Sequence, residues 1–400
     1  MRRKPERVAW MVLLLAFATF CLIVVAVPLG VHRYIRNAEK EHEASVESLA
    51  GTIVVEPPLG VAPVPLSAGQ NMSVPEGSLI RTDETSEAAI TFFDHSFMRL
   101  FSGSTIQLDR SRSPRYKSSP LANTVHVTLM GGQAHIATAL SLNSPLDCRV
   151  TTLHAESSLE ADGSYAIEAT NDRSEIAVYR GRAQVTANDQ TIAVETRQRS
   201  TIAFGQAPEP PVGVAQDLVT NGDFSRPLSK GWRVFTDQGT DGGDVDGTAE
   251  LVVDQGRRAV KLERSGGQGN HCETILEQSI SQKLPDPATS LIVRATVKTS
   301  HQSLPGGGYL SSEYPLMIRL TYRDVYDSEA EWIQGFYYEN PINTPTAYGL
   351  QIPRDRWYLF ESDNLLESLP IRPYRIIKLR VYAAGWDYES LISEINLIVE

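Results

Sequence analysis

The sequence predicts an all-β ectodomain behind one N-terminal transmembrane helix. Residues 8–31 (VAWMVLLLAFATFCLIVVAVPLGV) form a single uncharged apolar run. A helix of that length can cross a hydrocarbon core of about 30 Å. After residue 50 the chain alternates apolar and polar residues, is rich in Thr, Val, Ile and Tyr, and is broken by Gly, Pro, Asn-Gly and Asp-Gly. This texture is typical of short strands joined by tight turns.

The charges that flank the apolar run predict its orientation. Four basic residues precede it within residues 1–7, whereas the basic residues that follow it are diluted by glutamates. The positive-inside rule therefore places residues 1–7 as a cytoplasmic stub and the remainder outside the cytoplasm, as a single-pass protein of the cell membrane. A cleaved signal peptide is the alternative. The run is longer than a usual signal core and its best cleavage site, residues 25–27, is poor, so an uncleaved anchor is favoured.

Two further segments divide the rest of the chain. Residues 32–50 are charged and weakly amphipathic, which predicts a stalk that continues the helix. Residues 206–212 contain stacked prolines, which favour an extended linker. The ectodomain is accordingly divided into one module at 51–205 and a second at 213–400.

Composition limits the classes of partner. The net charge of −11 and the absence of a basic stretch argue against nucleic acid and against binding to anionic lipid headgroups. The predicted contact with the bilayer is therefore residues 8–31. Cys21 lies in that run, which leaves Cys148 and Cys272 in different modules. A disulfide between them and two buried free thiols are both open possibilities.

The first module contains four motifs in order. They are Gly77–Thr82, Phe93–Leu100, Leu129–Ile136 and Ile176–Val185. Within the central part, apolar side chains at alternate positions are expected to point inward: Ile90, Phe92, Met98, Leu100, Ile106 and Leu108.

This order of motifs resembles the FecR domain over about residues 51–205. The resemblance implies an extracytoplasmic β-structure, which in the best-known architecture relays receptor occupancy to a sigma factor. Regulatory members carry a sigma-binding helical region before the transmembrane helix. Seven residues leave no room for that region, so direct regulation of a sigma factor is not expected here.

The second module opens and closes with a matching pair of motifs. It begins with Asn221-Gly222-Asp223-Phe224 and Gly231-Trp232, and it ends with a strand that contains Glu394-Ile395. These motifs resemble galactose-binding-like β-sandwiches, the jelly rolls of many carbohydrate-binding modules. The resemblance implies that the first and last strands lie side by side. It also implies a possible structural calcium near them, with Asp223 and Glu394 as the side-chain donors.

Aromatic residues in this module predict a sugar site, because flat apolar faces stack on pyranose rings while amides and carboxylates bind hydroxyls. Trp386 is the first candidate, since Gly385-Trp386-Asp387-Tyr388 reads as a loop where an aromatic ring is not easily buried. The predicted ligand-binding residues are Trp386, Trp332, Tyr338, Asp387 and Tyr388. The alternative, that these aromatics pack between two sheets, remains open.

No sequence motif indicates catalysis: a phosphate loop, G-x-S-x-G and H-E-x-x-H are all absent from the sequence. The hypothesis is a non-catalytic, membrane-anchored envelope protein that binds a polysaccharide or another surface ligand through its second module. Two alternatives stay open. One is a structural or assembly protein whose modules contact other envelope proteins. The other is a sensory partner in transmembrane signalling that lacks a sigma-binding domain of its own.

Overall fold

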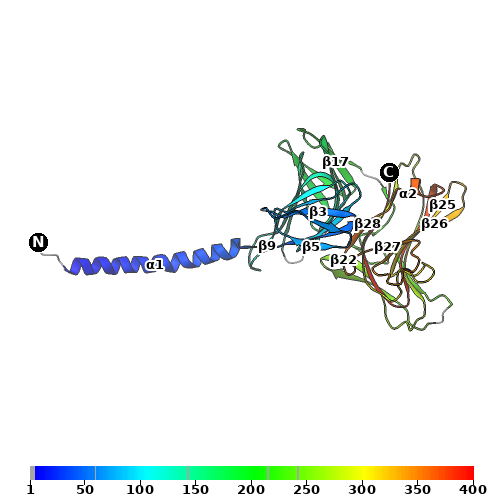
Figure 1. The fold of residues 1–400 in the computed structure, drawn as a ribbon. Helices are drawn as coiled ribbons and strands as arrows, with labels where there is room; N and C mark the ends of the chain where they lie inside the picture. The colour runs from blue at the N-terminus through cyan, green and yellow to red at the C-terminus, as the bar shows by residue number, and fades with distance from the viewer. Residues whose placement is uncertain (1–4, 59, 142–143, 214–215, 241–242) are drawn as a thin grey trace.

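A computed structural model describes residues 5–58, 60–141, 144–213, 216–240 and 243–400 (Figure 1). One long helix projects from the first of two β-rich bodies, and the second body lies beyond it. The predicted fold class, an all-β ectodomain behind one N-terminal helix, is confirmed. Residues 1–4 of the predicted stub lie outside the described residues.

Helix α1 (Pro5–Asn37) is the single-pass membrane anchor. Within its segment Ala9–Asn37, an 18-residue window has a mean hydropathy of 2.9 and no residue buried against the rest of the chain. Apolar side chains therefore cover its whole circumference, which is the pattern expected of a helix surrounded by lipid. At about 1.5 Å per residue, the 33 residues of α1 extend beyond the hydrocarbon core on the side of the β-rich bodies.

The first module consists of two sheets that close on each other as a barrel. In spatial order, the strands of one sheet are β4 (Val64–Ser67), β3 (Thr52–Glu56), β6 (Leu79–Arg81), β9 (Thr105–Pro114), β10 (Asn123–Ala137), β11 (Leu146–Thr151), β12 (Glu156–Leu159), β15 (Arg182–Ala187) and β16 (Gln190–Glu195), and β1 (Glu39–Glu41) also pairs with β9. The strands of the other are β5 (Asn71–Val74), β2 (Ala44–Ala50), β7 (Glu87–Thr91), β8 (Phe97–Leu100), β10, β13 (Ser164–Ala169), β14 (Arg173–Arg180), β17 (Gln198–Ala203) and β18 (Val212–Gly213).

Strand β10 belongs to both sheets because it changes partner near its middle. Residues 124–131 pair with β9, residues 132–137 pair with β13, and residues 134–137 also pair with β8. The change occurs at Gly132, which has φ +92° and whose missing Cβ would lie 2.5 Å from the Cα of Ser104. A residue with a side chain would be both strained and sterically excluded at this point, so the fold requires the glycine at position 132 of the motif Leu129–Ile136.

The prediction of a helical stalk over residues 32–50 is wrong beyond Asn37. Helix α1 ends there, and β1 and β2 follow as strands of the first module. Ala44, Val46 and Ser48 alternate into the core and are fully buried, while β2 pairs with both β5 and β7. Pairing on both edges outweighs the helical preference of this charged sequence.

The alternating apolar residues predicted for the first module are confirmed as core. All six, from Ile90 to Leu108, are at most 3% exposed and belong to one cluster. Cys148 and Cys272 are buried free thiols, which is one of the two possibilities left open, and they form no disulfide with each other. Burial raises the pKa of the Cys148 thiol, which keeps it protonated and unreactive.

The second module is a β-sandwich. One sheet has the order β21 (Thr248–Asp254), β22 (Arg257–Arg264), β30 (Tyr388–Val399), β24 (Leu291–Gln302) and β28 (Tyr358–Glu361), and β19 (Gln216–Asp217) also pairs with β30. The other sheet has the order β20 (Arg233–Asp237), β23 (Cys272–Lys283), β29 (Pro373–Gly385), β25 (Leu316–Asp324), β26 (Glu329–Tyr337) and β27 (Gly349–Gln351), and a single-turn helix α2 (Leu365–Ser368) follows β28. The pairing of β19 with β30 brings the first and last strands together, as the resemblance implied.

The proline-rich segment 206–212 does not hang free between the modules. The Glu209 amide donates to the Thr201 carbonyl at 2.9 Å, and the Ser200 hydroxyl donates to the Glu209 carbonyl at 2.7 Å. Strand β18 then pairs with β17. The segment is therefore fastened along the edge of the first module before the chain enters the second.

The two modules share a packed interface. An apolar cluster joins Phe97 and Ala137 of the first to Trp357, Leu359 and other residues of the second. Around it, the buried guanidinium of Arg257 donates to the Ala137 carbonyl at 2.6 Å and lies 4.4 Å from the Phe97 ring centre. Apolar packing with buried hydrogen bonds across the boundary holds the modules in one relative orientation.

Candidate ligand-binding cleft between the modules

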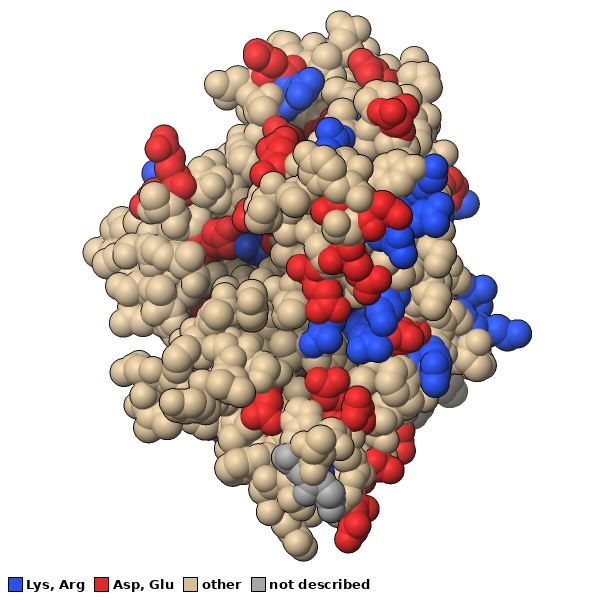
Figure 2. Space-filling model, turned by 90° about the vertical axis from the view of Figure 1, so that its right-hand side faces the viewer, with Lys and Arg blue, Asp and Glu red and all other residues tan. Residues whose placement is uncertain are grey.

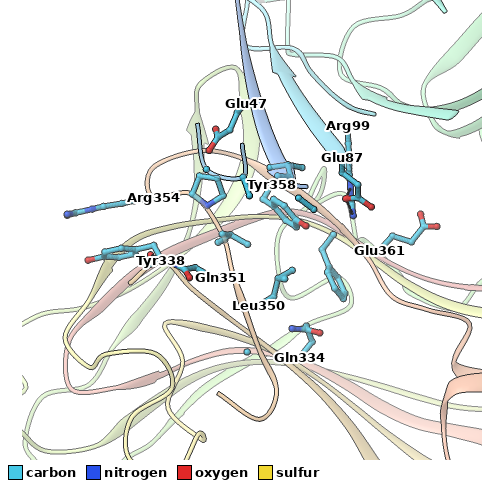
Figure 3. A pocket seen from close by; sticks show the side chains of 18 of the residues that line it. Glu47, Glu87, Arg99, Gln334, Tyr338, Leu350, Gln351, Arg354, Tyr358 and Glu361 are labelled. Carbon is cyan, nitrogen blue, oxygen red and sulfur yellow. Dashed lines mark hydrogen bonds and ion pairs between the residues drawn. The ribbon is translucent and has the colours of Figure 1, made fainter. Parts of the chain in front are cut away.

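A cleft of about 930 Å³ opens where the two modules meet (Figure 3). The first module contributes the end of β2 and residues of β7 and β8. The second contributes β26, the chain from Ala347 to Arg354 that contains β27, and β28. This volume lies in the range of pockets that bind small molecules or short oligomers. The cleft exists only because the interface fixes one module against the other.

Arg99 of β8 forms the inner wall of this cleft. Its guanidinium donates to the Glu87 carboxylate at 2.6 Å and to the Leu359 carbonyl of the other module at 2.7 Å. It also lies 5.5 Å from the ring centre of Tyr358. Arg99 is 8% exposed, so its contacts are largely shielded from water. One side chain therefore supports the wall of the cleft and joins the two modules.

Every carboxylate that lines the cleft has an arginine partner. Glu87 pairs with Arg99, Glu47 with Arg356, and Glu361 with Arg294 at 2.5 Å. Burial raises the pKa of Glu47, although the nearby Arg356 guanidinium acts in the opposite direction. These paired carboxylates can accept hydrogen bonds from a ligand.

The outer rim carries an aromatic ring with one amide beside it, and a second amide lies farther along the cleft (Figure 3). The Arg354 guanidinium lies 4.8 Å from the ring centre of Tyr338, and Figure 3 shows both residues at the same edge of the cleft. Gln351 donates to the Tyr338 carbonyl at 3.0 Å, and Gln334 donates to the Tyr348 carbonyl at 3.1 Å. Each of these amides keeps an oxygen able to accept a hydrogen bond. The rim thus combines a flat apolar surface with donors and acceptors.

The structure places two of the predicted ligand-binding residues near this cleft. Tyr338 lines it and is half-buried. Trp332 lies on the inner face of β26 and stacks on Phe360, with ring centres 6.3 Å apart and planes at 25°. It therefore supports the cleft wall from behind, and the open alternative of an aromatic packed between the sheets applies to Trp332.

The other three predicted residues lie at the turn between β29 and β30. Trp386 is 40% exposed there, as expected for a loop aromatic. Asp387 accepts from the Gly267 amide at 2.8 Å, so it also fastens a neighbouring loop. Tyr388 is 1% exposed and its hydroxyl lies 2.6 Å from that of Thr274. A direct ligand contact by Tyr388 is contradicted, because the side chain belongs to the core of the sandwich.

The residues predicted to hold calcium do not fit that ion. Asp223 accepts from the amide and hydroxyl of Ser225, which closes a turn. Glu394 is 5% exposed, burial raises its pKa, and it faces the guanidinium of Arg180 at 3.9 Å. No group of three or more His, Cys, Asp or Glu residues suited to a metal occurs in the described part of the chain. Calcium needs six to eight oxygens, several of them carboxylates.

The face of the second module that turns away from the first has a different character. Figure 2 shows basic and acidic side chains interleaved across it. In the sheet that contains β23, β29 and β25, Arg380 pairs with Glu277 at 2.5 Å, and Arg319 donates to the Tyr382 hydroxyl at 2.8 Å. These groups satisfy one another, and the face presents no field of a single sign.

The half of the cleft that the first module contributes is not evident from the sequence. Glu47 fell in the predicted stalk, and Arg99 was treated only as part of a strand motif. One signal was present for Arg99, because it interrupts the apolar run Phe97–Leu100 and all four of these residues are buried. A charged residue inside a fully buried strand needs partners on another element, here β7 and β28.

A comparison with protein families matches part of the first module. Residues 78–184, which lie inside the first module, match the family described as FecR protein. No curated protein matches the sequence.

Among solved structures, a proposed anti-sigma factor from Parabacteroides distasonis is 12% identical with a TM-score of 0.28; the match covers 34% of this chain and 59% of that one. A second similar structure is a family 11 carbohydrate-binding module from Clostridium thermocellum in complex with a β-1,3-1,4-mixed-linked tetrasaccharide. It is 10% identical with a TM-score of 0.27, and the match covers 44% of this chain and 92% of that one. A family 28 carbohydrate-binding module specific for non-crystalline cellulose is 11% identical with a TM-score of 0.25, and the match covers 48% of this chain and 99% of that one.

Proposed function

We propose that this protein is a non-catalytic, membrane-anchored binding protein that takes a carbohydrate chain in the cleft between its modules. The observation that carries the proposal is the rim, where the Tyr338 ring stands beside Gln351 and Arg354, with Gln334 farther along the same cleft (Figure 3). An aromatic face stacks on the apolar side of a pyranose ring, and the amides and the guanidinium bind its hydroxyls.

The pairing of the cleft carboxylates supports a role in binding without catalysis. Glycoside hydrolysis needs one carboxyl group that gives up a proton and a second that acts as base or nucleophile. Glu47, Glu87 and Glu361 are each held by an arginine. Such partners fix the orientation of each carboxylate and engage its oxygens in ion pairs, which suits hydrogen bonding to hydroxyls better than proton transfer.

The test is a glycan array probed with the full chain in lipid nanodiscs, because sugar-based detergents would compete for the site. We expect binding to a subset of polysaccharide fragments. Tyr338→Ala should then weaken binding at least about tenfold, which corresponds to ~1.4 kcal/mol. Tyr326→Ala is the matched control, since Tyr326 is 77% exposed at the β25–β26 turn and lies outside the cleft.

A third variant separates the cleft from the site predicted at the β29–β30 turn. Loss of binding in Trp386→Ala with normal binding in Tyr338→Ala would move the site to that turn. Absence of binding across the array would refute carbohydrate as the ligand.

A specific observation favours protein contacts as a second candidate function. Tyr309 and Leu310 are 86% and 78% exposed in the loop between β24 and β25, and Ile342 is 70% exposed in the loop after β26. Hydrogen bonds fasten these two loops together, including one from the Thr344 hydroxyl to the Pro305 carbonyl at 2.9 Å. Large apolar side chains held rigidly in water are typical of a protein interface.

Crosslinking in the native envelope tests this second candidate. A photoreactive residue at position 310 should capture an envelope protein, while one at position 326 should not. Equal labelling from both positions would count against a specific contact at the two loops.

A further inference from the structure

The end of the membrane helix is fastened to a loop that lies about 80 residues further along the chain. The Ser119 hydroxyl donates to the Arg36 carbonyl at 2.6 Å, and the Arg115 amide donates to the Ala38 carbonyl at 2.9 Å. The rings of Tyr34 and Tyr116 meet edge to face, with centres 6.3 Å apart. Figure 1 shows β9, which precedes this loop, beside the end of α1. The loop is therefore held next to the membrane.

This contact gathers positive charge that the linear sequence conceals. Arg33, Arg36, Arg115 and Lys117 are all exposed, and none of them forms an ion pair with another described residue. We call these four residues the basic collar. The nearest carboxylate along the chain, Glu39, is already bound by Arg110 at 2.6 Å and by Arg112 at 3.5 Å. The collar therefore keeps its charge although the whole chain is acidic.

The other glutamates near the collar lie farther from the membrane. Glu41 belongs to β1, and Glu43 follows that strand. An extended chain advances about 3.3 Å per residue, so both lie roughly 13 Å or more along the chain beyond Asn37. They do not neutralise the collar at close range.

The position of the collar matches the headgroup layer of a bilayer. Arg33 comes two residues after the apolar run 8–31, and Tyr34 follows directly. Tyr34 and Tyr116 are 55% and 36% exposed, with an apolar ring and a polar hydroxyl. Tyrosines are enriched at this depth, and arginine and lysine bind phosphate there. The geometry matches a surface that rests on lipid.

We propose that the basic collar binds the phosphates of anionic phospholipid headgroups and docks the first module on the membrane surface. This contact is separate from the span by α1, and it does not depend on the identity of any ligand in the cleft. It differs from the expectation, drawn from net charge, that the chain does not bind anionic headgroups. The relevant charge is local, because screening limits interactions of exposed charges to about 10 Å.

The test uses the full chain in nanodiscs with a fluorophore at Ser118→Cys, an exposed position within the loop. Cys21→Ser removes the reactive thiol in the helix, and Cys148 and Cys272 are buried. Quenching by a lipid with a headgroup spin label reports contact between the loop and the bilayer. We expect stronger quenching when phosphatidylglycerol is added to phosphatidylcholine, and weaker quenching at high salt.

The variant Arg115→Gln with Lys117→Gln should lower the ratio of docked to undocked protein about 30-fold, because each basic residue near an anionic surface contributes favourable free energy to docking. The matched control is Arg226→Gln with Lys230→Gln. It removes the same charge from exposed positions of the second module and should leave the quenching unchanged. Equal quenching in both lipid mixtures, or a collar variant that behaves like the control, would overturn the proposal.

Discussion

Replacing Arg99 by Met removes the side chain that both supports the cleft and joins the modules. The loss includes a charge-assisted hydrogen bond to the Leu359 carbonyl, which contributes about 2 kcal/mol when buried. Contacts with the Phe101 and Tyr358 rings contribute about 1 kcal/mol. The side chain of Glu87 is 26% exposed and regains water, so its lost ion pair costs only about 1 kcal/mol.

The methionine recovers part of this loss by burying apolar surface, about 1 kcal/mol. We therefore expect Arg99→Met to lower the free energy of unfolding by about 3 kcal/mol. For folding units of 150 to 250 residues, that change lowers the melting temperature by about 6 to 12 °C. The same variant should also weaken ligand binding, because the inner wall of the cleft loses its support.

Differential scanning calorimetry of the soluble modules and of the full chain would measure the shift. Arg173→Met is a suitable control, since Arg173 is exposed at the start of β14 and forms no ion pair with the described residues. It should change the melting temperature by less than about 2 °C, as surface substitutions usually do. Shifts of equal size in Arg99→Met and Arg173→Met would refute the idea that Arg99 joins the modules.

Three further predictions concern the interior of the protein. A chelator should leave the melting temperature unchanged, because Asp223 and Glu394 do not fit calcium; a clear decrease in the melting temperature would instead support a bound metal at these residues. Burial raises the pKa of Glu394, so the folded protein holds this proton more tightly than the unfolded chain. The wild type should therefore lose stability relative to Glu394→Gln as the pH rises from 4.5 to 7, whereas parallel melting curves would contradict this reasoning. Tyr388→Phe should cost about 1 to 2 kcal/mol through the lost hydrogen bond to Thr274 and leave glycan binding unchanged; impaired binding with normal stability would place Tyr388 in the site.

Local patterns in the sequence were sufficient to predict the β-architecture and much of its core. Alternation over Ile90 to Leu108 identified buried side chains because β7 and the first half of β9 bury one face, while β8 is buried on both faces. Strand β2 was missed because its signal is short and lies among glutamates, so that its pairing with β5 and β7 decides its structure. Of the residues predicted to bind a ligand, Tyr338 lines the cleft, whereas Tyr388 is buried in the core of the second module.

The cleft itself could not be predicted, because it depends on the placement of one module against the other. Its walls come from positions as far apart as Glu47 and Glu361, and no local pattern relates them. The basic collar was hidden for the same reason, since Arg36 and Arg115 are far apart in the sequence. The net charge of the whole sequence argues against binding to anionic headgroups, whereas the charge of the basic collar that the fold brings together favours it.

The path of the chain limits where a ligand of the cleft can be. Helix α1 ends at Asn37, and Glu47 of β2 already lines the cleft ten residues later. An extended chain spans at most about 3.5 Å per residue, so the first wall of the cleft lies within roughly 35 Å of the helix end. The packed interface prevents the second module from swinging away from this position. A carbohydrate bound here must therefore approach the membrane closely, which favours polymers that lie next to the bilayer over those displayed far from it.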